Sequence, residues 1–187
     1  MFLVVGLGNP GSRYSGTRHN IGFLAVEFLA RGAEWRQKFQ GEIAQIELGG
    51  QKLTLLKPLT YMNESGQSVG PAAKFFKVEP RDVVVVHDEL DLPLGTVRIK
   101  QGGGDAGHNG LRSIRAHLGT GDFIRIRLGI GRPPPTFRGE IADYVLQGFP
   151  LADQGARDTM AEQAALALEL IVERGLSSAM NTVNQRK

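Results

Sequence analysis

A run of four valines at residues 83–86 constrains the fold of this chain more than any other feature of its sequence. β-branched side chains favour extended backbone, and successive side chains of a strand point to opposite faces of a sheet. A strand that is apolar at every position must be covered on both faces, which is typical of a central parallel strand between layers of helices. We therefore predict an α/β fold.

The rest of the chain alternates helical and extended patterns. Apolar residues at helical spacing predict helices over 21–31, 64–77, 110–118 and 152–174. Strands are predicted over 2–7, 42–48, 52–56, 83–86, 96–100 and 123–130, and Gly49-Gly50 indicates a two-residue hairpin. The hairpin makes part of the sheet antiparallel. We expect one three-layer α/β/α domain over residues 1–187, around a mixed, partly parallel sheet.

Composition excludes several classes of protein. The chain has 187 residues, enough for a sizeable core, and 41% of them are hydrophobic. It has no cysteine, so disulfides, thiolate zinc sites and cysteine nucleophiles are excluded. No apolar run approaches the length of a membrane span, and the apolar start is too short for a signal peptide. We expect a cytoplasmic protein.

Positive charge is concentrated in one segment of the chain. Residues 98–138 contain eight basic and two acidic side chains, whereas the protein as a whole has a formal charge of +3. The basic residues are Arg98, Lys100, Arg112, Arg115, Arg125, Arg127, Arg132 and Arg138. Such a segment favours a polyanionic partner such as nucleic acid, although a solvated basic face explains it equally well.

A glycine motif follows the first predicted strand. Gly6-x-Gly8-x-x-Gly11 imitates the dinucleotide fingerprint, but that fingerprint needs a helix to begin within the motif. Here Pro10 stiffens the loop and the predicted helix begins about nine residues after Gly11. We therefore expect the glycines to let the loop pass tightly and to aim Asn9 across a cleft.

His19 and Asp88 are the candidates for general-base chemistry. Histidine titrates near neutral pH and works as a base when an acceptor fixes its tautomer. Asp88 follows the valine strand, and the carboxyl ends of such strands border the active cleft of α/β proteins. The alternatives are a polar surface or capping role for His19 and a turn cap for Asp88, which Glu89 or Asp91 could provide as readily.

A metal site is the competing interpretation of the histidines. His87 and Asp88 are adjacent, with His108 or His19 as further ligands. Neighbouring strand residues point to opposite faces, so His87 and Asp88 should not share one ion while the strand persists. We expect no metal.

The remaining polar signals are individually weak. Asn20, Asn63 and Asn109 each precede a predicted helix, where capping is the default role. The glycine-rich loop at residues 102–110 could cradle phosphates or act as a lid, but no Gly-Lys-Ser/Thr follows it, and no Gly-x-Ser-x-Gly elbow occurs in the chain. Taken singly, these features indicate an α/β hydrolase or a nucleic-acid binder.

Taken in series, the motifs resemble those of the bacterial peptidyl-tRNA hydrolases in order and spacing, from residue 2 to about residue 150. The motifs run from Gly6 to Gly11, at Tyr14, from Thr17 to Gly22, from Pro58 to Asn63, at Ser65-Gly66, from His87 to Asp91, from Gly102 to Gly104, from Gly107 to Gly110 and from Arg127 to Gly131. The resemblance implies a single-domain α/β/α fold without metal or organic cofactor. It also implies a monomeric cytoplasmic enzyme that acts on peptidyl-tRNA released from the ribosome.

The resemblance also implies roles for individual residues. His19 matches the general base, Asp88 the carboxylate that holds it, and Asn9 the residue that helps to distinguish a blocked peptidyl amine from a free aminoacyl one. Residues expected to contact the peptide or the tRNA acceptor end, or to line the cleft, are Tyr14, Asn20, Tyr61, Met62, Asn63, His108 and Asn109. Lys100 and Arg127 match positions that hold tRNA phosphates. Asp105 departs from the pattern, since it adds a negative charge to the glycine-rich loop.

The implied reaction is water attack on an ester, with His19 as base and Asp88 stabilising the imidazolium. Two rival classes are distinguishable. A non-catalytic RNA-binding module would bind without turnover, and a metal-dependent amidohydrolase would lose activity to chelators.

Overall fold

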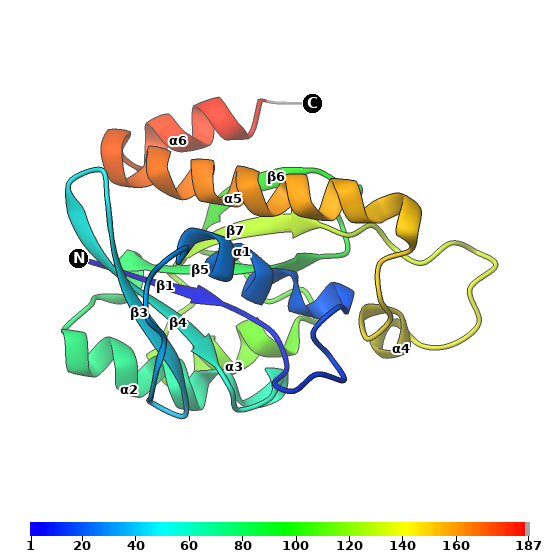
Figure 1. The fold of residues 1–187 in the computed structure, drawn as a ribbon, viewed down its shortest axis with the longest axis horizontal. Helices are drawn as coiled ribbons and strands as arrows, with labels where there is room; N and C mark the ends of the chain where they lie inside the picture. The colour runs from blue at the N-terminus through cyan, green and yellow to red at the C-terminus, as the bar shows by residue number, and fades with distance from the viewer. Residues whose placement is uncertain (186–187) are drawn as a thin grey trace.

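A seven-stranded mixed sheet forms the centre of the molecule in a computed structural model that describes residues 1–185 (Figure 1). The strands are β1 (Phe2–Gly6), β2 (Arg36–Lys38), β3 (Gly41–Leu48), β4 (Gln51–Pro58), β5 (Val83–Glu89), β6 (Val97–Gln101) and β7 (Ile124–Gly129). Their order is β2-β3-β4-β1-β5-β7-β6. The pairs β1–β4, β1–β5 and β5–β7 are parallel, and the other three pairs are antiparallel. The predicted mixed sheet is confirmed.

Helices cover both faces of this sheet. One face carries α1 (Ile21–Leu29), α5 (Gln154–Arg174) and α6 (Leu176–Val183), and the other carries α2 (Gly66–Phe76) and α3 (Asn109–Leu118) (Figure 1). The short helix α4 (Ile141–Val145) contacts the 3-10 helix Arg18–Asn20, which leads into α1. The three-layer α/β/α prediction is therefore confirmed. No helix within residues 1–185 has the length and apolar character that a membrane crossing requires.

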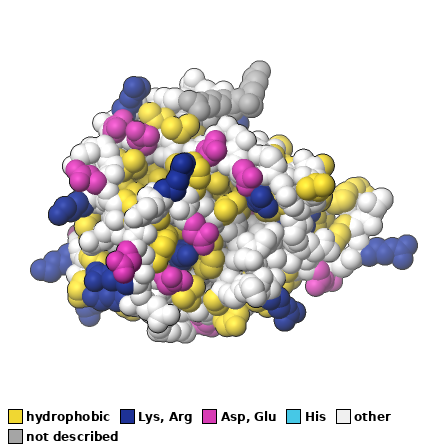
Figure 2. Space-filling view, viewed as in Figure 1, with side chains coloured by type: hydrophobic (Ala, Val, Ile, Leu, Met, Phe, Trp, Pro, Cys, Tyr) yellow, Lys and Arg dark blue, Asp and Glu magenta, His cyan; other side chains and the backbone are white. Residues whose placement is uncertain are grey.

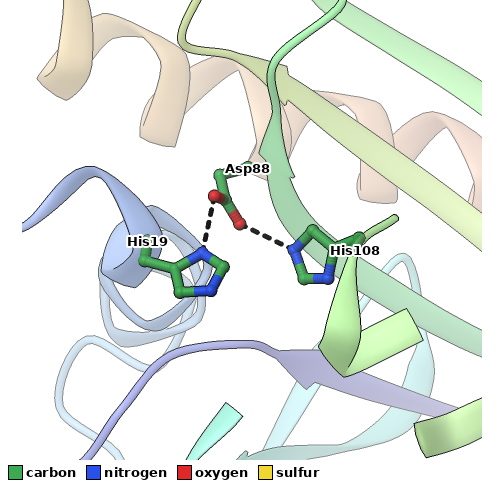
Figure 3. A group of neighbouring side chains, drawn as sticks. All are labelled: His19, Asp88 and His108. Atoms are coloured by element: carbon green, nitrogen blue, oxygen red, sulfur yellow. Dashed lines mark hydrogen bonds and ion pairs between the residues drawn. The ribbon is translucent and has the colours of Figure 1, made fainter. Parts of the chain in front are cut away.

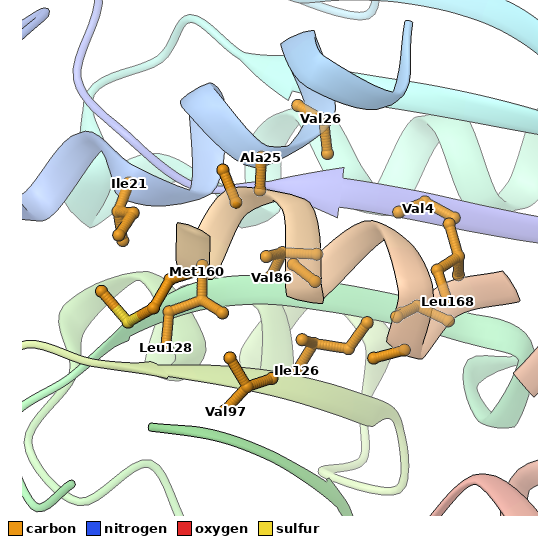
Figure 4. Packing of buried hydrophobic residues seen from close by; sticks show 14 of the residues in the cluster. Val4, Ile21, Ala25, Val26, Val86, Val97, Ile126, Leu128, Met160 and Leu168 are labelled. Carbon is orange, nitrogen blue, oxygen red and sulfur yellow. The ribbon is translucent and has the colours of Figure 1, made fainter. Parts of the chain in front are cut away.

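The valine run divides its side chains between the two layers. Val84 and Val86 belong to the cluster with α1 and α5, where Met160 and Leu168 pack (Figure 4), and Val83 and Val85 to the cluster with α2 and α3. All four valines are at most 1% exposed. Burial of one such side chain stabilises the fold by roughly 1.5–3 kcal/mol, and a one-residue slip would turn every side chain of β5 to the other face. The register of β5 is thus fixed, and so is the position of the polar residues at its end.

Glycine lets α1 approach the sheet closely. A Cβ at Gly22 would lie 2.6 Å from the backbone nitrogen of Leu7, and a Cβ at Gly6 would overlap the carbonyl oxygen of Gly22. A Cβ at Gly8 would lie 2.8 Å from the Phe23 ring. The prediction that the first glycines permit tight passage is confirmed, and α1 begins only at Ile21, outside the glycine motif.

Three short elements were not predicted from the sequence, namely β2, α4 and α6. Each has three to eight residues, too few for a hydrophobic period to be distinct. The valine strand is longer than predicted, because β5 continues through His87 and Asp88 to Glu89.

Two tight turns differ in how easily their residues adopt left-handed backbone. Gly49 and Gly50 join β3 to β4 with φ values of 57° and 76°, as the hairpin signal predicts. Phe39 and Gln40 join β2 to β3 with φ values of 57° and 51°, although neither is glycine. Tyr61 also has a positive φ, 65°. A non-glycine residue in this region costs on the order of 1–2 kcal/mol.

The edge strand β6 has side chains bound to its outward backbone groups. Asn184, which directly follows α6, accepts a hydrogen bond from the Ile99 nitrogen (2.8 Å) and donates one to the Ile99 carbonyl oxygen (2.9 Å). Nη1 of Arg98 donates to the Val97 oxygen at 2.9 Å. Part of the edge is therefore satisfied within the chain.

Candidate active site

His19 and Asp88 come from segments that the sheet topology brings together. His19 lies in the 3-10 helix Arg18–Asn20, at the end of the loop that leaves β1, and Asp88 lies near the carboxyl end of the neighbouring strand β5. Nδ1 of His19 is 2.7 Å from Oδ2 of Asp88 (Figure 3). The predicted juxtaposition of imidazole and carboxylate is therefore present.

His108 binds the other oxygen of the same carboxylate. Its Nε2 lies 2.8 Å from Oδ1 of Asp88, so two imidazoles hold one buried aspartate (Figure 3). Nδ1 of His108 accepts a hydrogen bond from the Leu111 nitrogen at 3.3 Å and so caps α3. Both nitrogens of His108 are engaged, which assigns its proton to Nε2. His108 thus supports Asp88.

The contact with Asp88 also assigns the tautomer of His19. A carboxylate only accepts, so Nδ1 of His19 carries the proton and Nε2 is the basic nitrogen. Within residues 1–185, Nε2 of His19 makes no hydrogen bond. This is the arrangement that a general base requires, with one nitrogen held and the other available.

The electrostatics agree with this assignment. Burial alone would lower the pKa of His19, but the charge of Asp88 and the hydrogen bond to it raise the pKa above its ordinary value. For Asp88, burial would raise the pKa, but the charges of His19 and His108 and their hydrogen bonds bring it well below its usual range. Asp88 therefore stays ionised while His19 titrates.

His87 lies outside this group of three. Its Nδ1 donates to the carbonyl oxygen of Asp88 at 2.8 Å, and its buried Nε2 has no partner within residues 1–185. Burial first, and then the charge of His108, lower the pKa of His87 to about 3. His87 is therefore neutral, and it packs edge-on against the ring of His108 with centroids 5.0 Å apart.

Three hydrogen bonds, one to the backbone of Met62 and two to the side chain of Asn20, hold Asn9 in place. Its Oδ1 accepts a hydrogen bond from the Met62 nitrogen at 2.7 Å. The carboxamide of Asn20 accepts from the Asn9 nitrogen and donates to the Asn9 oxygen, at 2.8 and 2.9 Å. Nδ2 of Asn9 remains as a donor without a partner within residues 1–185. Asn9 is thus held beside Met62, and it is not among the residues that line the cavity.

None of the three asparagines predicted to cap helices does so with its side chain, although Asn20 occupies the N-cap position of α1. Asn20 makes no cap hydrogen bond to α1, because its carboxamide is bound to Asn9. It is 3% exposed, so neither of its polar atoms is left for substrate. Asn109 is the first residue of α3, which His108 caps, and Asn63 lies inside a 3-10 helix whose cap is Tyr61. Asn63 and Asn109 are both exposed and keep their amides available.

Tyr14 and Tyr61 pack against each other. Their rings meet edge to face with centroids 6.4 Å apart, and Tyr61 is 57% exposed. Tyr61 directly precedes Met62, whose nitrogen binds Asn9. The two tyrosines therefore form an aromatic surface next to Asn9.

A cavity of about 500 Å³ adjoins His19, Asp88 and His108. Lys100 and Arg127 line it on the side of β6 and β7, and Ile141, Ala142 and Val145 of α4 form an apolar wall. Lys100 and Arg127, the expected phosphate-binding residues, therefore border the same space as His19 and Asp88.

The basic segment is less uniform than its charge count indicates. Arg125 is buried, and its guanidinium donates to the carbonyl oxygens of Gly103, Gly104 and Gly121, so it holds the glycine-rich loop in place. Arg127 is paired with Glu89 at 2.9 Å. On the face seen in Figure 2, basic and acidic side chains are interspersed. Apart from the buried Arg125, Lys100 is the one basic residue lining the cavity that has no ion pair within residues 1–185. Arg115 and Arg138 of the same segment are exposed outside the cavity.

Two further ion pairs involve arginines of the basic segment. Arg132 lies 2.6 Å from Asp91 and Arg112 lies 3.8 Å from Asp105. Asp105 also accepts a hydrogen bond from the Gly107 nitrogen. The acid in the glycine-rich loop therefore shapes its own turn.

Arg18 is a residue of the site whose function the sequence did not indicate. It is buried, it stacks on Tyr144, and its backbone nitrogen donates to the Gln147 oxygen at 3.0 Å. The contact joins α4 to the segment that carries His19. The sequence signal for Arg18 is its place directly before His19.

His19, Asp88 and His108 could also hold a metal ion, since one ligand atom from each lies within 4.8 Å of the others. His87 is not part of this set, as the alternation of the strand predicts. In an ion-bound state, Nε2 of His108 would lose its proton to the capping nitrogen Nδ1, which then could no longer accept from Leu111.

Comparisons with known proteins identify the family. The family model for peptidyl-tRNA hydrolase matches residues 3–187. The peptidyl-tRNA hydrolase of Sorangium cellulosum is 56% identical over 189 residues, covering 100% of this chain and 85% of that protein. That of Mycobacterium tuberculosis is 50% identical over 186 residues, covering 97% and 96%. The crystal structure of peptidyl-tRNA hydrolase from Acinetobacter baumannii has a TM-score of 0.92 at 41% identity, covering 100% of this chain and 96% of that one. The chain therefore belongs to the peptidyl-tRNA hydrolase family.

Proposed function

We propose that this protein hydrolyses the ester that links a peptide, or another N-blocked aminoacyl group, to the 3′ end of tRNA, with His19 as the general base. The observation that carries the proposal is the hydrogen bond between Nδ1 of His19 and Oδ2 of Asp88 at 2.7 Å. It leaves Nε2 as the nitrogen that takes a proton from water.

The chemistry needs no covalent intermediate. An ester is easier to attack than an amide, and the chain has no cysteine to serve as a nucleophile. Water loses a proton to Nε2 of His19 as the water oxygen attacks the ester carbon, and Asp88 stabilises the imidazolium that forms. The bond between that carbon and the ribose oxygen of tRNA then breaks, and the imidazolium returns the proton to the ribose oxygen, which leaves as the hydroxyl of free tRNA. Such base catalysis contributes typically about 10²–10⁴ in rate. The free Nδ2 of Asn9 is the candidate donor to the substrate, next to the exposed amides of Asn63 and Asn109.

The tRNA part of the substrate meets the β6–β7 side of the cavity in this proposal. Lys100 and Arg127 supply contacts to phosphates, which give affinity without reading sequence, as an enzyme that serves many tRNAs requires. We propose that one monomer with a single domain performs the reaction in the cytoplasm, and that no metal ion takes part.

The test offers N-acetyl-aminoacyl-tRNA and unblocked aminoacyl-tRNA side by side, with a transition-metal chelator present and Mg²⁺ retained for tRNA folding. We expect rapid cleavage of the blocked substrate alone. His19→Ala should bind tRNA as the native protein does but turn over at least 100-fold more slowly. Binding without turnover by the native protein would indicate an RNA-binding module, and loss of activity to the chelator would indicate a metalloenzyme.

A further inference from the structure

An aromatic patch lies on the side of the molecule away from Lys100 and Arg127. It consists of Phe39 in the β2–β3 turn and of Phe75 and Phe76 at the end of α2, and we call it the turn patch. The Phe39 and Phe75 ring centroids are 5.4 Å apart, and Nζ of Lys38 lies 3.8 Å from the Phe75 centroid. Phe75 is 58% exposed. The patch thus presents an aromatic face with a cation beside it.

The turn patch is connected to the candidate active site through the backbone. The Leu59 nitrogen donates to the Gln40 oxygen at 3.0 Å, and Tyr61 follows two residues after Leu59. One interstrand spacing and three Cα–Cα steps separate Phe39 from Tyr61, so their Cα atoms are at most ~17 Å apart. An extended peptide covers that distance with about five residues.

The backbone at both aromatic positions is unusual. Phe39, Gln40 and Tyr61 all have positive φ values, and glycine or asparagine is the ordinary choice there. Strained residues of this kind concentrate at sites that bind ligands. The turn therefore presents Phe39 where a glycine would close the hairpin with less strain.

The order of the strands separates the two parts of the substrate. His19 and Asp88 lie at the carboxyl ends of β1 and β5 in the middle of the sheet, with β6 and β7, which carry Lys100 and Arg127, to one side and the β2–β3 turn to the other (Figure 1). Tyr61 lies between the two sides, beside Tyr14 and Asn9. The ester joins tRNA to peptide. If the tRNA lies toward β6, the peptide leaves toward β3.

We propose that the turn patch binds the peptide part of peptidyl-tRNA, several residues upstream of the ester. The inference rests on the proposed function. Apolar and aromatic side chains of an extended peptide pack on Phe75 and Phe39, and Lys38 attracts acidic side chains and carbonyl oxygens. The peptide is favoured over RNA as the occupant, because the acceptor end cannot extend to both sides of the ester.

The experiment compares two substrates on Phe75→Ala, N-acetyl-phenylalanyl-tRNA and an N-acetylated octapeptidyl-tRNA with apolar residues at its upstream positions. We expect kcat/KM to fall roughly three- to tenfold for the octapeptide, mainly through KM, and to stay unchanged for the short substrate. The control is Leu166→Ala, which removes a similarly exposed apolar side chain from α5, on the other face of the sheet.

Each other outcome overturns the proposal. An equal loss on both substrates would indicate a structural role for Phe75, and no loss on either would leave the patch without a ligand. Weaker, salt-dependent binding of deacylated tRNA by the variant would make the patch an RNA surface. A failure of the proposed function is distinguishable, since the native protein would then cleave neither substrate.

Discussion

The guanidinium carbon of Arg18 lies 3.9 Å from the centroid of the Tyr144 ring. Nη1 of the same guanidinium donates a hydrogen bond to the backbone carbonyl oxygen of Tyr144 at 3.0 Å. Arg18 directly precedes His19, and Tyr144 belongs to α4, which forms the apolar wall of the cavity. This contact therefore joins the segment that carries His19, the proposed base, to the helix that forms one wall of the cavity.

Arg18→Ala should lower kcat for N-acetyl-aminoacyl-tRNA by about tenfold and destabilise the fold by about 2 kcal/mol, because a buried arginine loses both its stacking and its hydrogen bond. Arg18→Lys should restore little, since an ammonium group cannot reproduce the planar stack. Steady-state kinetics and urea unfolding measure the two effects.

The matched control is Arg31→Ala, because Arg31 also stacks on an aromatic ring, 4.0 Å from the centroid of Phe28, but is exposed and outside the site. Its kcat should equal that of the native protein. Equal losses in both variants would show that Arg18 acts only through general stability.

Asp88→Asn should shift the pH profile as well as the rate. The native kcat/KM should fall as pH decreases through the pKa of His19, which Asp88 raises, because the base must be unprotonated. Without the negative charge that pKa falls, so the acid limb should move to lower pH. The rate at the plateau should drop by about 10³–10⁴, as in serine-protease triads with the same replacement. An acid limb that keeps its position would contradict the pairing.

His87 should make the fold sensitive to acid. Its pKa is about 3 in the folded chain and about 6.5 when unfolded. The unfolded chain therefore binds an extra proton below pH 6.5, and stability is lost as pH falls from 6.5 toward 3, by roughly 3–5 kcal/mol. His87→Asn should flatten the pH dependence of the unfolding free energy across that window. If the unfolding free energy of His87→Asn fell by as much over this pH range as that of the native protein, the acid sensitivity would belong to other groups.

Lys100→Ala should weaken binding of deacylated tRNA and reduce the slope of log K against log salt by about one. Lys100 makes no ion pair within residues 1–185, so its charge is available to a phosphate. Arg127→Ala should have a smaller effect on the slope, since Arg127 is partly neutralised by Glu89. The control is Lys52→Ala, at the start of β4. If Lys52→Ala changed the slope as much as Lys100→Ala does, Lys100 could not be assigned a specific phosphate contact.

The central layers could be predicted from the sequence because their patterns are long and local. The valine run indicates a covered strand by itself, and the predicted helices at 21–31, 110–118 and 152–174 correspond to α1, α3 and α5. By contrast, α4 is held by contacts with Arg18, 126 residues away in sequence from its hydrogen-bond partner Tyr144. No local pattern encodes such a contact.

The sequence indicates the pair at the centre of the candidate site, but not the hydrogen bonds that surround it. His19 and Asp88 were identified from chemistry and resemblance, and their 69-residue separation is closed by the parallel pairing of β1 with β5. The sequence does not show which of several polar groups a given side chain will bind. Asn20 binds Asn9 instead of capping α1, because a buried backbone near the site needs its donors and acceptors filled.

The hydrogen bonds between Asn184 and Ile99 and from Arg98 to Val97 protect the edge strand β6 against pairing with a second molecule. At β6, a second copy of the chain would meet the carbonyl of Val97 and both backbone groups of Ile99 already bound, and at β2 it would meet a strand of only three polar residues. Asn184→Ala would uncover Ile99, and we expect refolding at high concentration to lose more of that variant to insoluble fibrils or swapped dimers.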